Sequence, residues 1–62
     1  MNITAYMIAH GIERIVYVPA SDLLPNPEFH AWLFDNTMEC GVGTTAEEAA
    51  ENAVRFVGKR AA

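Results

Sequence analysis

The sequence predicts an α+β fold: a small three- to four-stranded antiparallel sheet with one C-terminal helix packed on one face. Short runs rich in Ile, Val and aromatic residues are separated by segments containing Gly, Pro or Asn, which is typical of strands and turns. The stretch 46–57 instead places alanine and valine at helical spacing. A chain of 62 residues supports one domain, 1–62, with a small core.

The first half of the chain is expected to hold two strands and a loop. Residues 3–9 are predicted to form the first strand, which ends at Gly11, where glycine accepts the positive φ of a tight turn. Residues 12–19 follow as the second strand, and strict alternation places Ile12 and Arg14 on the same face. The segment ASDLLPNPEF carries two prolines and an asparagine, so a loop is expected there.

Two further strands are predicted around residue 36. In HAWLFD, Ala31 and Leu33 oppose His30, Trp32 and Phe34, so both faces carry apolar side chains. This pattern favours a position in the middle of the sheet. The second face is then covered by a partner or by the loop that precedes the strand, and both interpretations are open. Asp35-Asn36 is expected to form a turn, and residues 38–42 a short final strand.

The final helix is predicted to begin near Ala46. Thr45 and Glu48 form a capping box, in which each side chain accepts a hydrogen bond from the backbone N–H of the other residue. A favourable ion pair is expected between Glu51 and Arg55, one helical turn apart. Acidic residues in the first turn and Lys59 and Arg60 at the end match the helix dipole, and Gly58 is a suitable stop.

The charge distribution favours a basic protein as partner. The net charge is −4, and the interval between Arg14 and Arg55 contains seven carboxylates and no lysine or arginine. Because Lys and Arg supply most of the affinity for nucleic acids, direct binding to DNA or RNA is disfavoured. A second interpretation is that the acidic residues only keep a small protein in solution. The residues predicted to bind a partner are Asp35, Glu39, Glu47, Glu51, Trp32 and Phe34.

Catalysis, metals and cofactors are not expected. His10, His30 and Cys40 lack the spacing of a metal site. A Cys40–His30 nucleophile pair is disfavoured because the neighbouring Glu39 would raise the thiol pKa, so Cys40 is expected to act as a small core residue. Gly41 and Gly43 lack the third glycine of a dinucleotide fingerprint.

A cytoplasmic protein that self-associates is expected. There is one cysteine, no secretion signal and no apolar run near the roughly 20 residues that cross a membrane. Burial of more apolar surface in an interface would stabilise a domain with so small a core. We therefore predict a homodimer formed through a sheet edge or an exposed aromatic face.

The run FHAWLFD, then Cys40, then GTTAEEAAENAV resembles the N-terminal domain of HicB-type antitoxins over about residues 28–57. The family pattern is G-[DT]-T-x-E-E-A-x-x-N-A. The matching residues, in order, are Gly43, Thr45, Glu47, Glu48, Ala49, Asn52 and Ala53. This sequence departs from the family in having DNTMEC before the helix and a predicted strand before the matched region.

The resemblance implies a partial ribonuclease-H-like fold without catalysis, which binds and blocks a small basic RNA-cleaving toxin. No separate DNA-binding domain is expected, because the chain stops at Ala62. The alternative is a stand-alone inhibitor from a phage or mobile element that blocks a nucleic-acid machine through an acidic surface, as anti-CRISPR proteins do. That comparison rests on size and charge, not on a motif.

Overall fold

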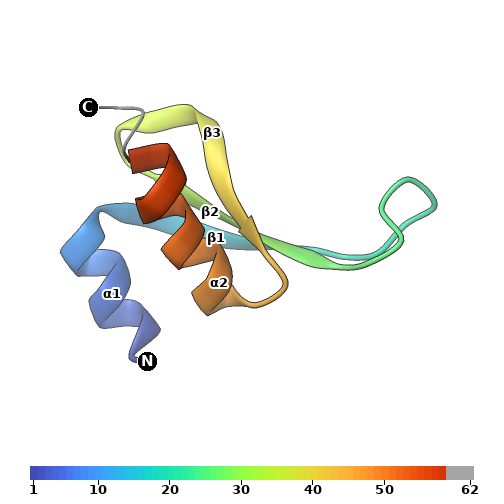
Figure 1. Cartoon of the computed structure of the whole chain (residues 1–62), viewed down its shortest axis with the longest axis horizontal. Helices are drawn as coiled ribbons and strands as arrows, with labels where there is room; N and C mark the ends of the chain where they lie inside the picture. Colours follow the sequence, from blue (N-terminus) through green and yellow to red (C-terminus); the bar gives the residue numbers. More distant parts are fainter. Residues whose placement is uncertain (59–62) are drawn as a thin grey trace.

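Residues 1–58 form a three-stranded antiparallel sheet and two helices (Figure 1). The structure is a computed structural model and describes residues 1–58. This small α+β architecture was predicted, but with a single helix at the C-terminal end. The elements are α1 (Ile3–His10), β1 (Ile12–Val18), β2 (Glu28–Leu33), β3 (Asn36–Gly43), α2 (Ala46–Asn52) and its π-helical continuation η1 (Ala53–Val57).

The segment predicted as the first strand is a helix, α1. The Asn2 side chain accepts a hydrogen bond from the backbone N–H of Ala5 at 3.1 Å and caps the helix start. Gly11, with φ of 68°, ends it in the left-handed conformation. Met7 is half-buried while Ile8 is 79% exposed. The prediction failed because the apolar residues of this helix lie on all its sides. The sequence therefore shows no hydrophobic period of 3.6 residues.

The sheet has the strand order β1-β2-β3, so the predicted central position of β2 is confirmed. Ala31 and Leu33 are buried on one face, and Ala31 pairs with Ile15 and with Gly41. The turn between β2 and β3 consists of residues 34–35, one residue earlier than predicted. A register shift after Ile12 lets that side chain join the buried face, so the prediction that it shares a face with Arg14 is wrong.

Both helices cover the same face of the sheet. The buried core consists mainly of small side chains: Ile12, Ala31, Leu33, Ala49, Ala50, Ala53 and Val57. Ile3, Tyr6 and Met7 of α1 pack against this cluster. The opposite face, which we call the open face, carries the even-numbered residues of β2, and no helix among residues 1–58 covers it.

Two glycines set the distance between α2 and β3. A Cβ atom built at Gly41 would overlap backbone atoms of Ala49 and Ala53. One at Gly43 would lie 2.6 Å from the backbone nitrogen of Ala49. The Gly41-x-Gly43 pattern therefore serves helix–sheet packing, because any side chain there would push the helix away.

The start of α2 follows the predicted capping box with one change. The Thr45 hydroxyl accepts a hydrogen bond from the Glu48 N–H at 3.0 Å, as expected. The Glu48 carboxylate, however, accepts from the N–H of Thr44 at 2.9 Å, not from that of Thr45. Gly58 is the C-cap residue of η1, in agreement with the predicted stop, and it has right-handed helical angles. The expected dipole match at Lys59 and Arg60 lies outside the described residues.

The loop between β1 and β2 projects from one end of the molecule (Figure 1). Its tip is a closed turn in which Ser21 and Leu24 exchange backbone hydrogen bonds of 2.7 and 3.2 Å. Leu23, in that turn, is 97% exposed. The loop therefore does not fold over the open face. This excludes the interpretation in which the loop covers the second face of β2.

Candidate functional site

The outward side of α2 carries two of the predicted partner-binding residues. Glu47 and Glu51 lie one helical turn apart and are both exposed. The inward side holds Ala49 and Ala50, each fully buried against the sheet. Neither Glu47 nor Glu51 forms an ion pair or side-chain hydrogen bond with any residue in the described part. We call Glu47 and Glu51 the acidic face of α2.

The predicted ion pair between Glu51 and Arg55 is not formed. Within residues 1–58, Glu13 pairs with Arg14 at 2.6 Å, and the Glu28 carboxylate lies 3.1 Å from Nε2 of His30. Arg55 instead lies near the ring of Phe56, with 5.8 Å from the guanidinium carbon to the ring centroid. Arg55 belongs to the π-helical segment η1, whereas Glu51 lies in α2.

Three further predicted residues lie at or beside the β2–β3 hairpin. Phe34 is in the turn and 67% exposed, and its backbone N–H donates to the Gly11 carbonyl at 3.0 Å. Asp35 completes the turn and is exposed. Glu39, on β3, is also exposed and interacts within the chain.

Trp32 lies on the open face. It pairs with Arg14 across the sheet, and the Arg14 guanidinium carbon lies 5.3 Å from the centroid of its ring. This contact is a cation–π interaction. Tyr17, by contrast, pairs with Phe29 on the helix side of the sheet.

The six predicted residues therefore do not form one surface. Trp32 belongs to the sheet face opposite the helices, whereas Glu47 and Glu51 lie on the outer side of α2. The sequence could not show this, because the separation depends on which sheet face the helices cover.

Cys40 is half-buried on the open face. It is not part of the buried core, so the prediction that it acts as a core residue is wrong. Burial raises the pKa of its thiol, and the negative charge of Glu28 raises that pKa further. Glu39 was predicted to be the cause, but it points to the opposite face of the sheet from Cys40, because successive strand residues alternate in direction. A raised pKa keeps Cys40 in the thiol form, which is a poor nucleophile.

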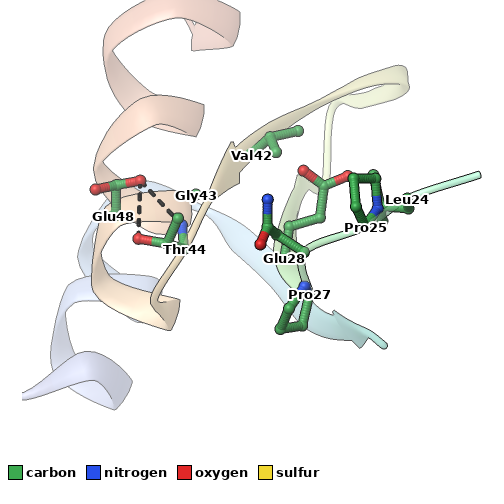
Figure 2. Close-up of a pocket in the computed structure, with 9 residues that line it drawn as sticks. Leu24, Pro25, Pro27, Glu28, Val42, Gly43, Thr44 and Glu48 are labelled. Atoms are coloured by element: carbon green, nitrogen blue, oxygen red, sulfur yellow. Dashed lines mark hydrogen bonds between the residues drawn. The ribbon is translucent and has the colours of Figure 1, made fainter. Parts of the chain in front are cut away.

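A pocket of about 360 Å³ lies where the returning arm of the β1–β2 loop meets the junction of β3 and α2 (Figure 2). Leu24, Pro25, Pro27 and Val42 provide apolar walls. The carboxylates of Glu28 and Glu48 also line it, and each is already engaged, with His30 and Thr44 respectively. Sequence reasoning missed this pocket, although the Pro-Asn-Pro segment signalled a stiff loop.

Asn52 has a structural role that the sequence did not reveal. Its side-chain amide donates a 2.7 Å hydrogen bond to the Val42 carbonyl. The bond ties the end of α2 to β3. Together with the two glycines, it fixes the orientation of α2 and hence of its acidic face.

Within residues 1–58, no group of three or more His, Cys, Asp or Glu side chains is arranged to hold a metal ion. None of the helices described is long and apolar enough to cross a membrane.

Comparison of the chain with protein-family models, with curated proteins and with solved structures finds no match.

Proposed function

We propose that this chain is a non-catalytic protein-binding module of the HicB-like antitoxin type, in which the acidic face of α2 docks onto a small basic RNA-cleaving toxin. The proposal concerns recognition alone, and no residue is given a catalytic role.

The observation that carries the proposal is the position of Glu47 within the HicB-like pattern. Six of the seven matching residues have structural work: Gly43 permits close packing, Thr45 and Glu48 cap the helix, Ala49 and Ala53 are buried, and Asn52 bonds to β3. Glu47 is exposed and has no polar partner among residues 1–58. Its charge in the first turn of α2 suits the helix dipole, but no contact among residues 1–58 uses its carboxylate, whereas recognition of a basic partner would.

The geometry of α2 supports the same proposal. Its buried side is locked against β3, so the acidic face is presented without a large loss of conformational entropy on binding. Exposed carboxylates of this kind act mainly on the rate of association with an oppositely charged protein.

The test uses affinity purification from the native host, followed by identification of the bound proteins by mass spectrometry. We expect a small basic protein to be recovered by the wild-type chain and lost with Glu47→Lys/Glu51→Lys. Glu13→Lys, an exposed charge reversal on β1, is the control and should retain the protein. Recovery of a large nucleic-acid-binding nuclease in place of a small toxin would favour the alternative, an anti-CRISPR-like inhibitor.

A further inference from the structure

Leu23 is the most exposed large apolar side chain in the described part of the molecule. It is 97% exposed at the tip of the β1–β2 loop. The turn that presents it is held by the two backbone hydrogen bonds between Ser21 and Leu24 and by a third, in which the Ser21 hydroxyl accepts from the Leu24 N–H at 3.2 Å. The side chain is thus displayed on an ordered turn, which lowers the entropic cost of inserting it into a pocket.

The pocket described above extends along the returning arm of the same loop, from Leu24 to the junction of β3 and α2 (Figure 2). Its walls at Leu24, Pro25, Pro27 and Val42 are apolar, and its volume of about 360 Å³ has room for an aliphatic side chain. The chain therefore carries both an exposed apolar side chain at the loop tip and an open apolar pocket beside the same loop.

We propose that two copies of this chain associate through their β1–β2 loops, with Leu23 of each copy inserted into the pocket of the other. The tip and the pocket both involve the same projecting loop. Two loops that lie antiparallel therefore bring the tip of each copy to the pocket of the other. A two-fold axis then forms both contacts at once, so the assembly closes as a dimer and does not extend into a filament.

The charges around the contact give this dimer a distinctive salt dependence. Asp22 next to the tip would approach Glu28 and Glu48 of the second copy, and the loop between β1 and β2 contains no lysine or arginine. Repulsion between these carboxylates opposes the dimer, and added salt screens it. Association should therefore strengthen as salt rises, whereas binding of a basic partner to the acidic face of α2 should weaken.

Sedimentation velocity on the full chain at rising concentration tests the proposal. We expect a mass that rises from 6.8 kDa towards twice that value, and a larger dimer fraction at higher salt. Leu23→Ala should raise the dimer dissociation constant at least about tenfold, since both contacts lose apolar burial together. Met38→Ala, which truncates a side chain that is 88% exposed elsewhere, is the control and should leave the constant unchanged.

A second variant probes the pocket. Val42→Glu places a charge in its wall and should weaken the dimer, while an equimolar mixture of Leu23→Ala and Val42→Glu keeps one intact contact and should associate more strongly than either alone. Circular dichroism checks that both variants are folded. A wild-type chain that stays at 6.8 kDa up to about 1 mM, which corresponds to a binding free energy weaker than about −4.1 kcal/mol, would overturn the proposal. So would a dimer that Leu23→Ala leaves intact. Neither result bears on the acidic face of α2.

Discussion

Gly41 determines how closely α2 can approach β3. A methyl group at this position would overlap the backbone of Ala49 and Ala53, and backbone atoms cannot move aside as a flexible side chain can. We predict that Gly41→Ala lowers the free energy of unfolding by about 3 kcal/mol or more, which is a large share of the stability of a small domain. Urea unfolding followed by circular dichroism measures this, and an unchanged midpoint would show that the helix is not held this close.

Cys40 gives the folded chain a dependence on alkaline pH. Its pKa is raised in the folded state by burial and by Glu28. Between the ordinary thiol pKa and the raised one, the unfolded chain has lost the thiol proton and the folded chain retains it. The folded state then binds more protons, so stability falls as pH rises through this window and is unaffected by the thiol below it.

This dependence can be isolated with Cys40→Ala, which removes the titrating group. We predict that the urea midpoint of the wild-type chain falls more steeply above the ordinary thiol pKa than that of the variant, and that the two curves run parallel below it. Parallel curves over the whole range would contradict the assigned burial of the thiol.

At the scale of elements, α1 depends on the left-handed conformation of Gly11. Its φ of 68° is unfavourable for any residue with a Cβ, although the space around it is open. We predict that Gly11→Ala costs about 1 to 2 kcal/mol from backbone strain alone. Gly58→Ala is the matched control, because Gly58 has right-handed helical angles and should accept alanine at no cost. Equal unfolding midpoints for the two variants would argue against the capped end of α1.

The elements differ in how far the sequence predicts them. β1, β2 and β3 were predicted because turn residues separate their apolar runs, and α2 because Thr45 and Glu48 mark its start. The helix α1 was missed, since Ile8 is exposed and the apolar pattern fits either period. The π-helical turn at Ala53–Val57 has no local signal in the sequence.

The candidate site was harder to predict than the elements. The exposure of Glu47 and Glu51 followed from helical periodicity. The separation of Trp32 from these two residues did not, because it requires knowing which face of the sheet the helices cover. The pocket beside Val42 joins a loop to a strand distant in sequence, and contacts of this kind are not encoded in local pattern.

At the scale of the whole molecule, the core is small and both proposed functions rest on surface residues. Within residues 1–58 the core has seven buried hydrophobic residues, and no large side chain there is completely buried. The two proposed surfaces differ in chemistry: the acidic face of α2 suits a cationic protein, while the loop tip suits an apolar pocket. Opposite responses to salt separate them experimentally.

The acidic face makes a further quantitative prediction for the recovered partner. Reversal of Glu47 and Glu51 to lysine should leave the fold intact, because both side chains are exposed and make no polar contact within residues 1–58. The expected loss lies in the association rate, which charge complementarity raises and salt screens over a Debye length of about 8 Å at physiological ionic strength.

The most direct measurement is the association rate of the recovered basic protein, followed from about 50 to about 500 mM salt for the wild-type chain and for Glu47→Lys/Glu51→Lys. We expect the wild-type rate to fall at least about tenfold over this range, and the rate of the double variant to be low and nearly independent of salt. A folded double variant that binds with the wild-type rate and the wild-type salt dependence would contradict the assignment of α2 as the binding face.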